Sequence, residues 1–204
     1  LKAIGWVRAE APPPPPRLGH AGGAGGVQKK LEQAVAEARA QHPDKPIEVW
    51  ATDEHRIGLR PILRRVWAPK GQRPIALGHH RYKWLYVTAF VQPTSGETFW
   101  YVSNGVSKPC FAALLALFAR EARAGRDRII VLGLDSAGWH TAPNLVVPEG
   151  LRLVYLPPYS PELQPAEHLW PILDEPLANR YFETLADLER TVAERCRVLE
   201  GDQL

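Results

Sequence analysis

Hydrophobic positions along this chain follow two spacings, and the order of those spacings predicts the fold class. Short runs rich in β-branched and aromatic residues predict strands, whereas apolar residues recurring every three or four positions predict helices. The predicted strands cover residues 47–52, 64–68, 82–91, 98–102, 128–134 and 151–156. The predicted helices cover residues 29–41, 107–123, 166–179 and 184–199. Strands that can form an antiparallel meander precede strands joined through helices, which predicts an α/β fold with a mixed sheet flanked by helices.

Two of these elements have the clearest patterns. The helix at 107–123 begins with Ser107, whose side chain can cap the first turn, and it places Pro109 within that turn. The strand at 128–134 is almost continuously apolar and is followed by Asp135, a pattern typical of a buried central strand.

Residues 1–27 differ from the rest of the chain in composition. Residues 1–8 predict the end of a helix that starts upstream, and residues 9–27 contain five consecutive prolines followed by a Gly-rich stretch. Consecutive prolines favour an extended conformation and glycines favour flexibility, so we interpret 9–27 as a linker. Because the sequence contains no methionine, we expect it to be a piece of a longer protein, with one domain at 28–204.

Length and composition exclude several classes of protein. At 204 residues, 45% of them hydrophobic, the chain is long enough to bury a core and too apolar for global disorder. The longest apolar run, 111–119, is far shorter than the roughly 20 residues of a membrane span, so no membrane partner is expected. The two cysteines, Cys110 and Cys196, cannot form a disulfide framework or a four-thiolate zinc site, which indicates a reducing cytoplasm.

Positive charge is concentrated in one stretch, although the net charge is only +3. Residues 55–95 contain no Asp or Glu, and they carry eight cationic side chains: Arg56, Arg60, Arg64, Arg65, Lys70, Arg73, Arg81 and Lys83. Such a stretch can be a solvated surface, or it can be the surface that contacts a polyanion such as DNA. The absence of acids over so long a stretch favours contact with a polyanion.

Three acids stand where the predicted elements could hold them rigidly. Asp53 and Asp135 each end an apolar strand, and Glu167 opens a helix after the proline-rich loop 157–165. Each acid alone can also be a cap or a favourable charge at the start of a helix. Together they form an oxygen-donor set of the kind that Mg²⁺ or Mn²⁺ prefers, and two such ions catalyse displacement at phosphorus. With the basic stretch holding phosphates, the residues predict metal-dependent phosphodiester chemistry.

Three blocks of sequence carry a resemblance to a known family. Residues 53–71, with Asp53-Glu54-His55-Arg56 at their start, resemble the first acidic block of bacterial insertion-sequence transposases related to the Tc1/mariner superfamily, the IS630 group. Residues 134–140 resemble the second block, and residues 156–167, followed by Trp170, resemble the third. The likeness extends from about residue 29 to residue 197, and three ordered blocks make it specific.

The resemblance implies a DDE transposase catalytic domain with a ribonuclease H-like fold. Asp53, Asp135 and Glu167 match the family's three catalytic, metal-binding acids, which implies Mg²⁺ or Mn²⁺, with two ions, and no small-molecule cofactor. The implied reaction is cleavage of DNA strands at the transposon ends, followed by attack of the freed 3′-hydroxyl on a target strand. The implied partners are DNA and a second copy of the chain, in a bacterial cytoplasm and associated with the nucleoid.

The sequence also departs from the family pattern. Ser136 and Gln164 replace residues that are usually Asn, and both substitutions keep a polar group. We expect the family's helix-turn-helix region to be missing before 28–204, and residues 9–27 replace its ordinary basic linker. A truncated, non-catalytic remnant that binds DNA without cleaving it is therefore the alternative function.

Five further residues are candidates for contact with DNA. Arg56, Arg60 and Lys70 flank the first acidic strand, so we expect them to bind phosphates. Tyr159 lies on the proline-rich loop and is the aromatic side chain best placed to contact the substrate. His140 follows Asp135 by five residues, where it can lie near the metals or a phosphate, or can be a structural histidine at a turn. Both interpretations of His140 stay open from the sequence.

Overall fold

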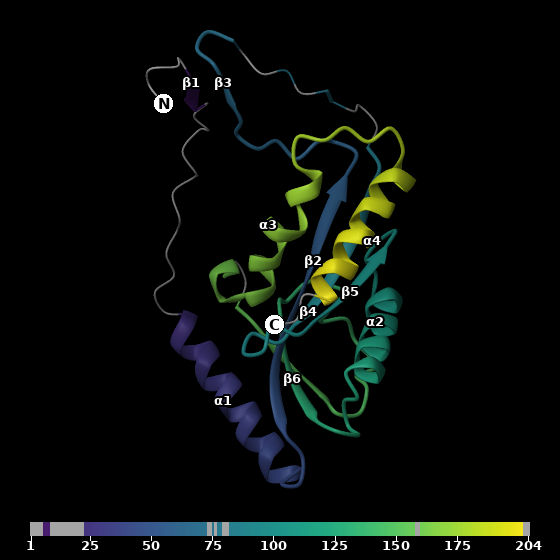
Figure 1. Ribbon diagram of the computed structural model, residues 1–204. Helices are drawn as coiled ribbons and strands as arrows, with labels where there is room; N and C mark the ends of the chain where they lie inside the picture. Colours follow the sequence, from purple (N-terminus) through teal and green to yellow (C-terminus); the bar gives the residue numbers. More distant parts are fainter. Residues whose placement is uncertain are drawn as a thin grey trace.

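A five-stranded mixed sheet forms the centre of the protein (Figure 1). The computed structural model describes residues 6–8, 23–72, 75, 77–78, 82–157 and 160–201, with only the backbone described for 6–8, 23–24 and 161. The order is β5-β4-β2-β6-β7, formed by β2 (Ile47–Gly58), β4 (Trp84–Val91), β5 (Thr98–Ser103), β6 (Ile129–Leu134) and β7 (Leu151–Tyr155). Strands β2, β4 and β5 pair antiparallel, whereas β6 and β7 run parallel to β2. The predicted mixed α/β sheet is confirmed.

Helices cover both faces of this sheet. Successive side chains along each strand point to opposite sides, and apolar side chains on both sides pack against helices. On one face, Ile129 and Val131 pack against α1 (Gly23–Gln41), and strand β4 packs against α4 (Leu185–Gly201). On the other face, Ile130 and Leu132 share a core with α2 (Lys108–Glu121). Every residue of β6 is buried, as expected of a strand covered on both sides. Among the helices of the described ranges, none is long and apolar enough to cross a membrane.

Helix α2 begins as its sequence predicts. The side chain of Ser107 accepts a hydrogen bond from the backbone N–H of Cys110 at 3.3 Å, and Pro109 lies in the first turn. Phe118 of α2 is fully buried and stacks on Phe90 with ring centroids 4.0 Å apart. The cap therefore fixes where the helix starts, and the aromatic pair fixes which side of it faces the sheet.

The predicted helix at 166–179 is wrong as a continuous element. The chain instead forms a 3₁₀ helix, η3 (Pro165–Leu169), then one turn of α-helix, α3 (Trp170–Leu173), and a second 3₁₀ turn, η4 (Glu175–Leu177). The physical reason is the recurrence of proline. Pro171 and Pro176 have no backbone N–H, so each is tolerated only in the first turn of a helix and forces a new start.

Two predictions near the N-terminus are also corrected. Residues 6–8 form a strand, β1 (Trp6–Arg8), which pairs antiparallel with β3 (Trp67–Pro69), so they are not the end of a helix. Backbone pairing with β3 here prevails over the helical pattern. Helix α1 starts at Gly23, inside the predicted linker, because extending a nucleated helix costs less than starting one. The remaining residues of the predicted linker lie outside the described ranges.

Candidate active site

The parallel register of β2 and β6 brings two of the three predicted acids to the same edge of the sheet. Ala51 of β2 is opposite Gly133 of β6, and the ladder between these strands ends there. Asp53 and Asp135 each come two residues after this last pair, so both lie just beyond the end of the ladder. The prediction that Asp53 ends its strand is wrong, because β2 extends from Ile47 to Gly58. Strand β4 pairs with β2 as far as Gly58, whereas the pairing of β6 with β2 ends at Ala51. Asp53 therefore lies in a part of β2 that has a partner strand on one side only.

Asp53 is held by an aromatic side chain and surrounded by negative charge. The indole Nε1–H of Trp170 donates a hydrogen bond to Asp53 Oδ2 at 3.1 Å. Burial raises the pKa of the Asp53 carboxyl to about 7, and the charges of Glu167 and Glu54 raise it further against hydrogen bonds from Trp170 and the Glu54 backbone that lower it. The structure therefore concentrates carboxylates around a partly buried carboxyl, a setting in which a bound cation is favourable.

Glu167 approaches Asp53 because η3 is anchored on β2. The side chain of Gln164 is buried and donates from Nε2 to the backbone carbonyl of Thr52 at 2.8 Å. The backbone N–H of Glu167 donates to the carbonyl of Gln164 at 3.2 Å, which continues this anchor into the 3₁₀ helix. Glu167 itself is exposed. Sequence reasoning treated Gln164 only as a substitution, whereas the structure shows that it positions the third acid.

Asp135 has a more open environment than Asp53. Its Oδ1 accepts a hydrogen bond from the backbone N–H of Ala137 at 3.0 Å and lies 2.6 Å from Nδ1 of His140. Its side chain is 51% exposed, and both of these contacts involve Oδ1. Asp135 thus caps the turn after β6 through Oδ1, and Oδ2 takes part in neither of these two contacts.

His140 is a buried link between two carboxylates. Its side chain is completely buried, Nε2 lies 3.0 Å from Glu54 Oε1, and the ring packs on Phe111 at 4.2 Å between centroids. Burial alone lowers the pKa of His140, but the carboxylates of Glu54 and Asp135 outweigh it and the pKa is raised. The buried ring uses both nitrogens within the protein, which favours a structural role at this turn, beside one of the predicted metal-binding acids. Contact of His140 with DNA stays a prediction.

Sequence reasoning missed Glu54 as a member of the site. Glu54 follows Asp53 in β2, so its side chain points to the opposite face of the sheet, towards α2. There it is 7% exposed and meets His140. The only signal in the sequence is a second acid inside a mostly apolar strand, and its partner lies too far along the chain to be foreseen.

The three predicted acids do not form a closed cluster. Asp53 lies close enough to Glu167 for their charges to interact, and Asp135 follows the end of β6, the strand that pairs with β2 beside Asp53. Within the part of the chain that is described, no three His, Cys, Asp or Glu side chains are gathered as a ready metal site. The donor set nevertheless fits a hard divalent cation, because all three groups offer carboxylate oxygens.

The cationic candidates lie apart from the carboxylates. Arg56 and Arg60 are exposed near the far end of β2, where the Arg56 guanidinium covers the Trp84 ring at 5.1 Å. Lys70 is exposed and directly follows β3, which lies beyond the tip of β2 and away from β6 (Figure 1). The structure therefore leaves all three free to meet solvent or a ligand without bringing them to the acids. Tyr159 lies outside the described residues.

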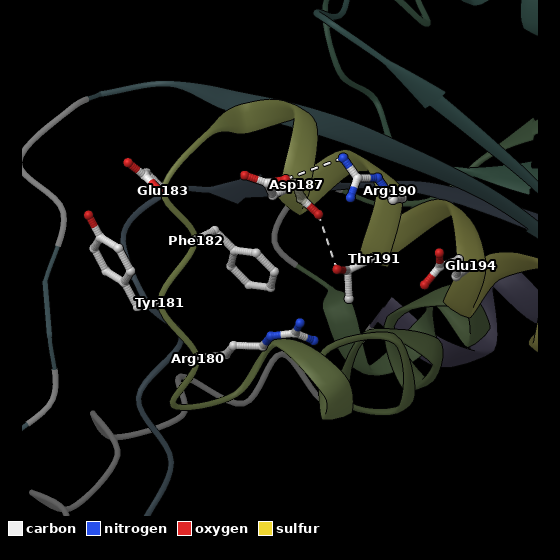
Figure 2. A pocket seen from close by; sticks show the side chains of 8 residues that line it. All are labelled: Arg180, Tyr181, Phe182, Glu183, Asp187, Arg190, Thr191 and Glu194. Carbon is white, nitrogen blue, oxygen red and sulfur yellow. Dashed lines mark hydrogen bonds and ion pairs between the residues drawn. The ribbon is translucent and has the colours of Figure 1, made fainter.

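A separate pocket lies against the start of α4 (Figure 2). It has a volume of about 380 Å³ and is lined by Arg180, Tyr181, Phe182, Glu183, Asp187, Arg190, Thr191 and Glu194. The Arg180 guanidinium covers the Phe182 ring at 5.0 Å, and Arg190 pairs with Asp187 at 3.3 Å (Figure 2). None of the three predicted acids lines this pocket, so it is distinct from the candidate site.

Comparison with known proteins finds a family match over the part of the chain that contains the three predicted acids. The family model for DDE superfamily endonucleases matches residues 48–189. The uncharacterized protein y4pE/y4sA of Sinorhizobium fredii (strain NBRC 101917 / NGR234) is 35% identical over 106 residues, which are 52% of this chain and 77% of the relative.

Solved structures of the Mos1 transposase share the fold. The mariner Mos1 paired end complex with Mg aligns with a TM-score of 0.56 and 16% identity, over 98% of this chain and 62% of the Mos1 chain. The pre-cleavage Mos1 transpososome aligns with a TM-score of 0.55 and 13% identity, over 99% of this chain and 68% of the other. This chain thus spans about two thirds of the Mos1 length, and the ribonuclease H-like fold is confirmed. With the family match covering Asp53, Asp135 and Glu167, the chain belongs to the DDE superfamily of endonucleases.

Proposed function

We propose that this chain is the catalytic domain of a DDE transposase of the IS630 type, which cleaves DNA strands and transfers them in a reaction that needs divalent metal. One observation carries the proposal: Asp53 and Asp135 both lie just beyond the end of the β2–β6 ladder, and η3, anchored on β2 by Gln164, carries Glu167 close enough to Asp53 for their charges to interact. Family membership supplies the reaction class, and the arrangement of the acids supplies residues to perform it.

The acids of this chain would hold the metal and so define the reacting centre. Asp53, Asp135 and Glu167 would bind Mg²⁺ or Mn²⁺ through their carboxylate oxygens. Two such ions, when bound, activate an attacking oxygen and stabilise the leaving oxygen of an in-line displacement at phosphorus. Structures of Mos1 titled as complexes with Mg, with Mn and as a strand transfer complex support this choice of ion and reaction.

The surface beyond the acids would hold DNA. Arg56, Arg60 and Lys70 are exposed cations, and contacts from such side chains to phosphates give affinity without sequence preference. Tyr159 stays a candidate for substrate contact, and a homodimer that acts on paired transposon ends follows from the same family resemblance. Structures of Mos1 titled as paired end complexes support both DNA and pairing of ends.

A second function, DNA binding without cleavage, is favoured by one observation. The described residues include no closed cluster of three metal-binding side chains. A remnant of a transposase would keep the fold and the basic surface while its acids no longer close on an ion. It would bind DNA in a salt-sensitive way and nick nothing.

A nicking assay on supercoiled plasmid in Mn²⁺ separates the two functions. Wild type is compared with Asp135→Asn and with Asp127→Asn, a control that removes one surface charge paired with Arg123. Catalysis predicts nicking by wild type and by the control, and none by Asp135→Asn. Equal nicking by Asp135→Asn would contradict the assigned site. DNA binding without nicking in all three proteins would establish the remnant instead.

A further inference from the structure

The indole of Trp170 connects two of the proposed metal-binding elements. Trp170 is the first residue of α3 and directly follows η3, which carries Glu167. Its Nε1–H reaches across to β2 and donates to Asp53 Oδ2 at 3.1 Å. One turn of the chain therefore presents the third acid and also holds the first.

The orientation of this indole is fixed from both sides. His55, two residues beyond Asp53 on the same face of β2, stacks on the Trp170 ring with centroids 5.0 Å apart and planes within 13°. His55 Nε2 lies 3.0 Å from Asp174 Oδ1, and the backbone N–H of Asp174 donates to the carbonyl of Trp170 at 2.9 Å. The indole ring is therefore held between His55 of β2 and the chain that follows Trp170. In this orientation its N–H points at Asp53.

A second tryptophan in the same core shows that packing does not require this arrangement. Trp100 belongs to the same hydrophobic cluster, is 8% exposed against 7% for Trp170, and meets the Trp170 ring edge-on at 6.2 Å. Its Nε1–H donates to Thr98 Oγ1 at 3.0 Å, two residues away in its own strand. A buried indole needs an acceptor, and a local hydroxyl is sufficient. Trp170 instead uses a carboxylate oxygen of the candidate site.

We propose that Trp170 is a positioning residue for catalysis: its indole N–H fixes the carboxylate of Asp53 and couples it to the turn that carries Glu167. This role rests on the proposed metal-dependent function. Partners of this kind orient metal ligands without touching the metal, and their loss usually lowers metal affinity or activity by about 10–100-fold. The effect of Trp170 should therefore exceed what its packing alone contributes.

The test compares Trp170→Phe with Trp100→Phe. Each variant keeps an aromatic ring in the same core and removes one indole N–H, so the two share the cost of losing bulk and one hydrogen bond. Three quantities are measured: Mn²⁺ affinity by calorimetry without DNA, the plasmid nicking rate at saturating Mn²⁺, and the urea concentration at half-unfolding. We expect both variants to lose similar stability, and only Trp170→Phe to lose Mn²⁺ affinity or nicking rate, by about tenfold or more.

Each other outcome has a separate meaning. If both variants kept the Mn²⁺ affinity and nicking rate of wild type, the positioning role would be overturned and Trp170 would be a core residue only. Equal losses in both variants would overturn it too, because the cause would then be general loosening of the core. Wild type that neither binds Mn²⁺ nor nicks DNA would contradict the proposed function itself, and the role of Trp170 would fall with it.

Discussion

Asp53 and Asp135 each come two residues after the last pair of the β2–β6 ladder, yet the protein holds them in opposite ways. Asp53 is partly buried, is bonded by the indole of Trp170, and has the charges of two glutamates nearby. Asp135 is half exposed and is bonded by a backbone N–H and by the buried ring of His140. The first is fixed from the α3–α4 side of the sheet, and the second from the α2 side.

Strand β2 explains how one sheet serves both aspartates. Asp53 and Glu54 are consecutive, so they point to opposite faces. Asp53 belongs to the proposed site, whereas Glu54 contacts His140 and His140 contacts Asp135, with nitrogen–oxygen distances of 3.0 and 2.6 Å. The comparison teaches that the α2 face of the sheet, remote from Trp170 and Glu167, also determines the geometry of the site.

The largest effect is expected from replacing either aspartate itself. Asp53→Asn and Asp135→Asn should each lower the nicking rate by about a thousandfold or more, because metal-assisted chemistry supplies several kcal/mol of the barrier reduction. The comparison predicts that their folding stabilities differ. Asp53→Asn removes a partly buried carboxyl surrounded by negative charge and should not destabilise the metal-free protein, whereas Asp135→Asn deprives His140 of a charged partner. Urea unfolding of both variants checks this difference, and equal destabilisation would contradict it.

Removal of His140 should be the largest stability effect among the supporting residues. His140→Ala leaves the carboxylate of Glu54 buried without its partner, which should lower the free energy of unfolding by about 3 kcal/mol. His168→Ala, at an exposed position of η3, is the control and should leave the free energy of unfolding unchanged. Chemical denaturation measures both. A His140→Ala protein as stable as the control would show that the buried link does not exist in solution.

A smaller effect is expected at the anchor of η3. Gln164→Ala removes the hydrogen bond to the Thr52 carbonyl and should cost about 1–2 kcal/mol of folding stability. Because this anchor places Glu167 near Asp53, Mn²⁺ affinity should also fall, whereas Asp135 should keep its contacts with His140. Calorimetry with Mn²⁺ tests this, and unchanged affinity would mean that Glu167 is positioned without Gln164.

The smallest effect is expected on the exposed cations. Arg60→Ala should leave folding stability and Mn²⁺ affinity unchanged, and should reduce the slope of log K for DNA against log salt by about one. Arg126→Ala, which removes an exposed cation in the turn before β6, is the control and should leave that slope as it is. DNA binding by wild type and both variants, measured over a range of salt concentrations, gives these slopes. Identical slopes would place the DNA surface elsewhere.

The sequence predicts most of the local elements of this fold, because these elements depend on short spacings. The apolar run of β6 followed by Asp135, and the Ser107 cap of α2, are signals contained within one element. The helix predicted at 166–179 is wrong as one element, although Pro171 and Pro176 are a local signal against a continuous helix.

The contacts that make the site could not be predicted, because they join residues distant in sequence. Trp170 and Asp53 are 117 positions apart, and His140 and Glu54 are 86 apart. The extension of β2 past Asp53 depends on pairing with β4, and the burial of His140 depends on packing with α2. Such features follow from the tertiary arrangement, in which a residue's neighbours are set by the sheet order.

The most direct test of the account is the effect of Mn²⁺ on thermal unfolding of the protein without DNA. A ligand that binds only the folded state stabilises it by about 2.7 kcal/mol at one hundred times its dissociation constant. The account predicts that Mn²⁺ raises the unfolding temperature of wild type, and that Asp53→Asn, Asp135→Asn and Glu167→Gln each lose most of that rise. No rise in wild type, or the same rise in all four proteins, would contradict the claim that these three acids hold a divalent ion.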